Sequence, residues 1–300
     1  MTPLKSPLIA ALAVAAGLFV YAQTAAPMRP RDVDALPSKP PDTRIPYGKD
    51  DLQYGELRLP KGPGPFPLAI VIHGGCWVTR FASTQNTAAL ADALRDAGVA
   101  TWNVEYRRAD HPGGGWPGTF TDIAAATDIV RTIAKKHPLD LSRVITVGHS
   151  AGGHLALWAA ARARLPATSP LYTASPLPLR AAVALGGPGD LRAFRAYGDK
   201  ICGGPVIDQL MGGAPETVAE RYAQGSPVEM LPLGVRQVLI VGLNDGVMPA
   251  PEREMYAAKA TKAGDRAEIV EVPGGHFEVI APTSAAWPTV RDTILETVRK

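Results

Sequence analysis

The sequence predicts an α/β fold in which a mainly parallel sheet carries helices on both faces. From Tyr54 onward, short apolar runs alternate with longer amphipathic runs, and this alternation is typical of chains that build parallel sheets. The short runs are rich in β-branched and aliphatic residues, as expected for strands buried on both sides. Of the 300 residues, 46% are hydrophobic, which is enough apolar material for one large core. We therefore expect one α/β domain over residues 51–300.

The first residues are typical of a secretory signal peptide. Lys5 precedes an uncharged run from Leu8 to Ala22, and small residues and proline follow it. Cleavage after Ala22 would leave Val20 and Ala22 at the two small-residue positions. An uncleaved membrane anchor is the alternative, but the run is shorter than the about 20 apolar residues that span a bilayer. We expect residues 1–22 to be removed and the protein to be exported, periplasmic or secreted, without stable membrane association.

Residues 23–50 are expected to form an extended, proline-rich arm that leads to the domain. The segment has no apolar periodicity. Its prolines are Pro27, Pro30, Pro37, Pro40, Pro41 and Pro46.

The expected strands and helices alternate along the rest of the chain. Two of the helices are followed by glycine, a common C-terminal cap. The strands are Gly55–Leu59, Leu68–Ile72, Ala100–Val104, Val144–Val147, Ala181–Leu185, Val238–Val241 and Glu268–Val272. The helices are Thr84–Ala97, Phe120–Lys136, Ala151–Ala163, Glu252–Ala263 and Thr289–Val298.

The stretch from Gly186 to Leu233 breaks this alternation and is rich in glycine and proline. Ligands bind at the carboxyl edge of the strands in open α/β sheets. We expect this stretch to be a small insertion over that edge, and therefore over the active site.

Charge and cysteine content narrow the function classes. The net charge is only +3 and the basic residues are scattered, so the sequence shows no surface for nucleic acid. The two cysteines, Cys76 and Cys202, would form one disulfide in an exported protein or remain thiols in the cytosol. The histidines match no metal-binding pattern, so we expect neither a metal nor another cofactor. The sequence does not indicate the oligomeric state.

The stretch Gly148-His149-Ser150-Ala151-Gly152 fits the pattern G-x-S-x-G and stands between an expected strand and an expected helix. Ser150 is therefore placed on the sharp strand-to-helix turn that exposes a nucleophilic serine. Small residues flank such a serine because the strained backbone leaves little room for large side chains. An incidental serine in a glycine-rich turn is the weaker alternative.

The stretch His73-Gly74-Gly75-Cys76-Trp77 follows the expected strand Leu68–Ile72. Loops of this type place glycine N–H groups around a developing oxyanion. We predict that Gly74 and Gly75 form this oxyanion hole together with the N–H of Ala151 at the helix N-terminus. His73 is expected to stabilise the loop by hydrogen bonding, and Trp77 to line the substrate pocket. Trp116 is a second candidate for the pocket wall.

The acid and the base should follow the serine in that order along the chain. Asp245 follows the expected strand Val238–Val241, and His276 follows the last expected strand on a glycine-containing loop. Asp190 is the competing acid because it also follows a strand. We favour Asp245, since its strand adjoins the one that precedes His276.

Taken together, these motifs resemble the α/β-hydrolase esterases with an HGGxW loop, which include kynurenine formamidase-like enzymes and bifunctional feruloyl and acetylxylan esterases. The resemblance implies the α/β-hydrolase fold, a triad of Ser150, Asp245 and His276, and an oxyanion hole at Gly74, Gly75 and Ala151. Cys76 and the stretch Gly113–Pro117 depart from the family pattern near the expected pocket, which leaves the substrate class open. The matching stretches are His73–Trp77, Asn103–Arg107, Gly148–His154, Asn244–Pro249 and Gly275–Phe277.

We therefore expect a serine hydrolase that cleaves small-molecule carboxylic esters with small to medium acyl groups through an acyl-enzyme. An arylformamidase would use the same residues on an N-formyl aniline, and a small serine peptidase would use them on a peptide bond. A non-catalytic binding protein on the same fold is a further alternative, but such proteins usually lack a triad residue.

Overall fold

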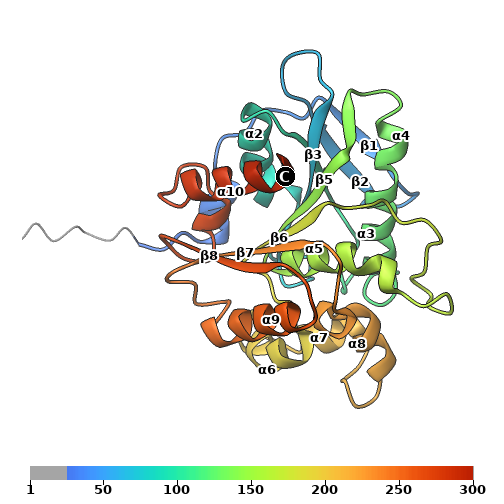
Figure 1. Cartoon of the computed structure of the whole chain (residues 1–300). Helices are drawn as coiled ribbons and strands as arrows, with labels where there is room; N and C mark the ends of the chain where they lie inside the picture. Colours follow the sequence, from blue (N-terminus) through green and yellow to red (C-terminus); the bar gives the residue numbers. More distant parts are fainter. Residues whose placement is uncertain (1–25, 300) are drawn as a thin grey trace, which may run out of the picture.

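A single sheet organises residues 26–299, which are the residues that the computed structural model describes (Figure 1). β1 pairs antiparallel with β2, and β2 pairs antiparallel with β4, whereas all other neighbouring strands are parallel. The predicted mainly parallel sheet is confirmed. In spatial order the strands are β1 (Thr43–Pro46), β2 (Tyr54–Arg58), β4 (Ala100–Val104), β3 (Phe66–Ile72), β5 (Leu139–His149), β6 (Ala181–Leu185), β7 (Arg236–Gly242) and β8 (Ala267–Val272).

Helices cover both faces of the sheet because its central strands carry apolar side chains on both sides (Figure 1). On one face, Val183 of β6 packs in a cluster with Leu94 and Ile294. On the other face, Leu239 of β7 packs in a cluster with Leu157. The helices of the first face are α2 (Ala88–Asp96) and α10 (Trp287–Arg299); those of the second include α3 (Gly118–Asp128), α4 (Val130–Ile133), α5 (Ala151–Ala161) and α9 (Ala250–Lys262).

The segment predicted as an extended arm contains two further elements. A short helix, α1, spans Pro30–Asp34, and β1 adds an edge strand to the sheet beside β2. The prediction of an extended arm is wrong for these residues. The strand was missed because β1 has only four residues, which alternate between half-buried and exposed positions, and four residues are too few for a clear strand pattern. Pro46 fits at the end of an edge strand, where no ladder partner is lost. The predicted signal peptide, residues 1–22, lies outside the described residues.

The predicted insertion between β6 and β7 is helical. α6 (Leu191–Cys202), α7 (Val206–Met211) and α8 (Ala219–Gly225) follow one another there, and Figure 1 shows them beside α9. Gly203 ends α6 in the left-handed conformation, as C-terminal glycines commonly do. Four 3₁₀ turns complete the described elements: Thr84–Thr87, Arg162–Arg164, Pro227–Met230 and Glu278–Ile280. Within residues 26–299, no helix combines the length and apolar character needed to cross a membrane.

Candidate active site

Ser150 stands on the turn between β5 and α5, as the sequence predicts. Its backbone has φ 53° and ψ −121°, a strained conformation for a residue with a side chain. The Ser150 N–H donates to the carbonyl of Leu185 at 2.8 Å, which fixes the turn against β6. Gly152 lies so close to β3 that a Cβ there would be 2.2 Å from the Ile72 carbonyl oxygen. The small residues of the motif are therefore required by close backbone approach.

His276 and Asp245 form a buried pair at the same edge of the sheet. The His276 Nδ1 donates to Asp245 Oδ2 at 2.9 Å, and the Asp245 side chain is fully buried. Burial alone would raise the Asp245 pKa. The hydrogen bond from His276, the charge of the His276 imidazole and the N–H groups of Val247 and Met248 outweigh burial and lower the pKa below its usual value. Asp245 therefore stays ionised and holds the His276 ring with Nε2 free to accept a proton.

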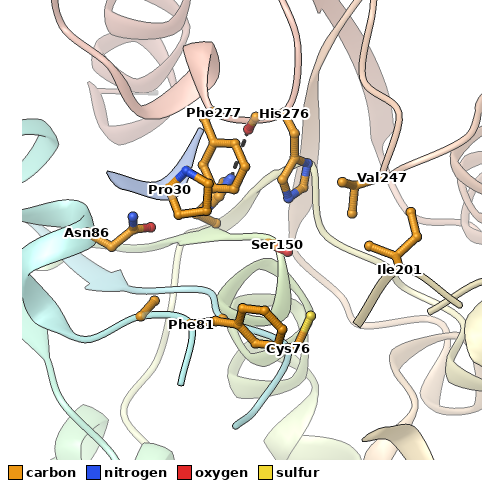
Figure 2. A pocket seen from close by; sticks show the side chains of 12 residues that line it. Pro30, Cys76, Phe81, Asn86, Ser150, Ile201, Val247, His276 and Phe277 are labelled. Atoms are coloured by element: carbon orange, nitrogen blue, oxygen red, sulfur yellow. Dashed lines mark hydrogen bonds between the residues drawn. The ribbon is translucent and has the colours of Figure 1, made fainter. Parts of the chain in front are cut away.

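Ser150 and His276 line one cavity, and Figure 2 shows the imidazole of His276 pointing towards Ser150. The structure thus brings together the three residues that the sequence predicted as a triad.

The competing acid, Asp190, has a different place. Its carboxylate caps the N-terminus of α6 by accepting from the N–H groups of Arg192 and Ala193, each at 3.1 Å. Its other oxygen pairs with Lys259 at 3.0 Å. Asp190 is therefore used by the helix cap and an ion pair, and it does not contact His276.

Sequence analysis missed Gly186, which directly follows β6 beside the His–Asp pair. Its φ of +60° is in the left-handed region, and a Cβ would lie 2.9 Å from Asp245 Oδ2 and 3.0 Å from His276 Nδ1. A larger residue at position 186 would displace the pair. The signal in the sequence was a glycine at the end of a strand, which is too common to single out.

The predicted oxyanion residues surround Ser150. Gly75 lines the cavity and has φ +101°, and Gly74 packs so tightly that a Cβ would be 3.0 Å from the Ser150 Cβ. Ala151 is the first residue of α5, so its N–H has no acceptor within the helix. Of the three residues, Gly75 lines the cavity, Gly74 packs against Ser150, and Ala151 follows Ser150 at the start of α5.

A buried ionic cluster lies behind this loop. His73 Nε2 donates to Glu105 Oε1 at 2.9 Å, and Arg108 contacts the same oxygen at 2.8 Å. Burial would raise the Glu105 pKa, but the His73 imidazole and the Arg108 guanidinium outweigh it and bring the pKa to about 2. The Tyr106 hydroxyl donates to the His73 carbonyl at 3.0 Å. His73 therefore anchors the loop, as predicted, and Glu105 and Arg108 are supports that sequence analysis missed.

His149 supports the loop that carries His276. Its Nε2 donates to the His276 carbonyl at 2.9 Å, and the two rings are 4.7 Å apart. Burial, together with the neighbouring His276, lowers the His149 pKa to about 3. His149 is therefore neutral and acts as a hydrogen-bond donor to the loop that carries His276.

The cavity itself is small and mainly apolar. Its volume is about 180 Å³, below the roughly 300–1,000 Å³ of pockets that enclose drug-sized ligands. Apart from the two histidines, no side chain that lines it is ionisable within the described part of the chain. Its apolar walls come from Pro30, Phe81, Ala82, Ile201, Val247 and Phe277 (Figure 2).

Both tryptophans predicted as pocket walls are placed elsewhere. Trp77 is 1% exposed and packs edge-on against His154, with ring centroids 5.4 Å apart. Trp116 packs edge-on against Phe120 at 5.3 Å. For Trp77 the prediction was wrong because Cys76 and Trp77 both have positive φ, 53° and 55°, and this backbone turn directs the indole into the core.

Cys76 and Cys202 form a disulfide across 126 residues of sequence. The bond joins the residue after Gly75 to the last residue of α6, and Ile201 next to it lines the cavity. The loop that carries Gly74 and Gly75 is therefore covalently linked to the insertion. Among the described residues, no group of three or more His, Cys, Asp or Glu side chains is arranged to hold a metal ion.

Comparisons with known proteins identify the family and the fold of the chain. The family model BD-FAE matches residues 56–259. The chain is similar to the probable carboxylic ester hydrolase LipM of Mycobacterium tuberculosis, with 25% identity over 220 residues, or 69% of this chain and 50% of LipM. The chain thus spans about half the length of this curated relative.

Two solved structures share the architecture. A truncated carbohydrate esterase from gut microbiota superimposes with a TM-score of 0.72 at 24% identity, over 87% of this chain and 100% of that one. Esterase B from Lactobacillus rhamnosis, inhibited by a tributyrin phosphonate, gives a TM-score of 0.71 at 19% identity, over 87% of each chain. At these identities the likeness establishes the α/β-hydrolase fold.

Proposed function

The chain belongs to the BD-FAE family, and from this premise we propose that it is a serine carboxylesterase. The proposal rests on one observation. Ser150 and His276 line the same cavity at the carboxyl edge of the sheet, and His276 is paired with the buried Asp245. A serine, an imidazole and a carboxylate in this relation are the parts needed for acyl transfer through a covalent intermediate.

In the first half-reaction, the Ser150 Oγ attacks the ester carbonyl carbon while His276 Nε2 takes its proton. The carbonyl π electrons move to oxygen, and the tetrahedral oxyanion accepts hydrogen bonds from backbone N–H groups of Gly74, Gly75 and Ala151. Each such donor contributes about 3 kcal/mol to lowering the barrier. Asp245 stabilises the charged imidazole. The oxyanion then collapses, the alcohol oxygen leaves with the proton of His276, and Ser150 remains acylated.

In the second half-reaction, His276 takes a proton from water, and the resulting nucleophile attacks the acyl carbon. Collapse of the second tetrahedral species releases the carboxylic acid, and Ser150 recovers its proton from His276. No further reactant is needed, since each proton taken up by His276 is returned within the same half-reaction.

The size and lining of the cavity favour an uncharged ester with a short acyl group. A volume of about 180 Å³ with mainly apolar walls suits a few methylene groups and gives no counter-charge for an acidic acyl chain.

We also propose that the protein is exported and acts outside the cytoplasm. The sequence pattern of residues 1–22 supports this location. The Cys76–Cys202 disulfide supports it independently, since disulfides persist in oxidising compartments and are rare in the cytosol.

The test is a comparison of wild type with Ser150→Ala on p-nitrophenyl acetate, butyrate and octanoate. Ser142, exposed on the same strand β5, gives the control variant Ser142→Ala. Because loss of the nucleophile removes the covalent route, kcat should fall at least about 10⁴-fold in Ser150→Ala and remain near wild type in Ser142→Ala. Full activity in Ser150→Ala would disprove the proposed mechanism. N-formylkynurenine and a p-nitroanilide peptide belong in the same assay, because exclusive turnover of either would assign a formamidase or a peptidase instead.

A further inference from the structure

We propose that the segment Met28–Asp34, upstream of the region that matches the family model, forms a wall of the ester-binding cavity, and that Pro30 limits the length of the group accepted there. This inference deepens the proposed esterase function and rests on it. Pro30 lines the cavity together with Asn86 and Phe277, and Figure 2 shows the three side chains on the same side of Ser150. We call these three residues the N-terminal wall.

The segment is attached to the loop that carries His276. The Met28 N–H donates to Glu278 Oε1 at 2.8 Å. The other oxygen of that carboxylate, Oε2, accepts from the Gly275 N–H at 3.0 Å. One glutamate therefore joins the start of the segment to the residue preceding His276, which fixes the position of the wall relative to the catalytic base.

The other end of the segment is attached beside the cavity as well. The Asn86 Nδ2 donates to Asp34 Oδ1 at 2.9 Å, and Gln85 Nε2 donates to the Asp34 carbonyl at 3.0 Å. Between the two attachments, Val33 is 1% exposed and belongs to the core cluster of α2 and α10. Because both ends and the middle are held, Pro30 is a fixed part of the cavity.

The chemistry of Pro30 suits a boundary for an apolar chain. Its ring is rigid, carries no N–H, and occupies the first position of α1, where a missing donor costs nothing. The matched family region begins at residue 56, so this boundary comes from a part of the chain that the family pattern does not include. The acyl or alcohol length that the enzyme accepts is therefore set partly by residues outside the matched family region.

The experiment compares chain-length profiles of Pro30→Ala and Pro30→Trp with wild type. Alanine retains the helix start and removes ring carbons, so kcat/KM for p-nitrophenyl octanoate relative to acetate should rise about tenfold, as two or more extra methylene groups become buried. Tryptophan should lower that ratio. The matched control is Pro37→Ala, an exposed proline of the same region, which should leave the profile unchanged. Thermal melting shows whether each variant is folded.

A binding measurement separates this inference from the proposed chemistry. In the Ser150→Ala background, Pro30→Ala should tighten the Kd of octanamide relative to butyramide, as measured by calorimetry, whether or not the wild type turns over esters. Unchanged chain-length profiles and unchanged Kd ratios in both Pro30 variants would contradict the proposed role of Pro30 in the cavity wall. Ester turnover that depends on Ser150 would still support the esterase function in that case. Failure of ester turnover with a shifted Kd ratio would overturn the esterase function alone.

Discussion

Asp245 and Asp190 both follow strands of the parallel sheet, but their side chains bind different partners. Asp245 accepts from His276 Nδ1 and from two backbone N–H groups, whereas Asp190 caps α6 and pairs with Lys259. The difference arises from the neighbouring strand, because β7 lies next to β8 and brings its loop to the loop of His276.

Asp245→Asn should therefore lower kcat on a short p-nitrophenyl ester by about 10⁴-fold, since asparagine favours the wrong imidazole tautomer. Asp190→Asn should stay within about threefold of wild type, because asparagine is also a good N-cap. Steady-state kinetics of the two variants checks this. Equal losses in both, or a larger loss in Asp190→Asn, would contradict the assignment of the acid.

The lowered pKa of Glu105 predicts that the folded protein loses stability at acidic pH. Its ordinary pKa of 4.5 falls to about 2 in the folded protein, so the unfolded chain binds its proton more readily than the folded one. The stabilisation is fully present above pH 4.5 and is lost as the pH falls towards 2. A shift of this size corresponds to about 3 kcal/mol of free energy of unfolding.

Urea denaturation of wild type and Glu105→Gln at several pH values between 5 and 3 measures this effect. The variant should be less stable above about pH 5, because His73 and Arg108 lose their partner, and the gap should narrow as the pH falls. Parallel stability curves would show that Glu105 does not contribute to the acid sensitivity.

The residues of the proposed triad could be singled out from the sequence because their motifs are local and their order along the chain is fixed by the fold. The pocket walls were not. Trp77 follows the glycines of the loop and looked like a wall, but the positive φ of Cys76 and Trp77 turns the ring into the core. No pattern of residue types reveals such a backbone turn, and the same is true of Gly186, whose importance depends on what a Cβ would contact.

At the scale of elements, the central strands were predictable because burial on both faces requires continuous apolar runs. β4 and β6 have the predicted bounds. Elements held at the margin of the core leave a weaker signal: α1 has five residues and β1 has four. Their stability comes from tertiary contacts, such as the burial of Val33 and the pairing of β1 with β2, which a local pattern does not encode.

The disulfide connects two parts of the fold, the loop that carries Gly74 and Gly75 and the end of α6. Chain-entropy reasoning for a loop of 126 residues gives a stabilisation of up to about 5 kcal/mol. The double variant Cys76→Ala/Cys202→Ala should therefore unfold in urea with a free energy about 2–5 kcal/mol lower than the oxidised wild type.

Reduced wild type is the matched control, because it lacks the bond but keeps both sulfur atoms. It should unfold near the double variant. The bond also attaches Cys76, the residue after Gly75, to the end of α6, so kcat should fall on reduction. Titration of two free thiols in the untreated exported protein would contradict the pairing itself.

At the scale of the whole molecule, the cavity is assembled from parts that are far apart in sequence. Pro30 comes from the N-terminal segment, Phe81 and Asn86 from the region after β3, and Ile201 from the insertion. The carboxyl edge of the sheet could be predicted as the site, since loops of parallel strands meet there. Which side chains face the cavity depends on how these separate segments pack, and this was beyond sequence patterns.

The proposed export of the protein must leave intact the N-terminal residues that line the cavity. Cleavage after Ala22 would make Gln23 the first residue of the exported protein, which retains Met28, whose N–H bonds to Glu278, and Pro30 in the cavity wall. Intact mass and N-terminal sequencing of protein recovered outside the cytoplasm should therefore find a chain beginning near Gln23 with its disulfide formed. An intact Met1 would refute cleavage. A chain beginning after Pro30 would be exported without the Pro30 part of the N-terminal wall, and it should show the longer acyl preference expected of Pro30→Ala.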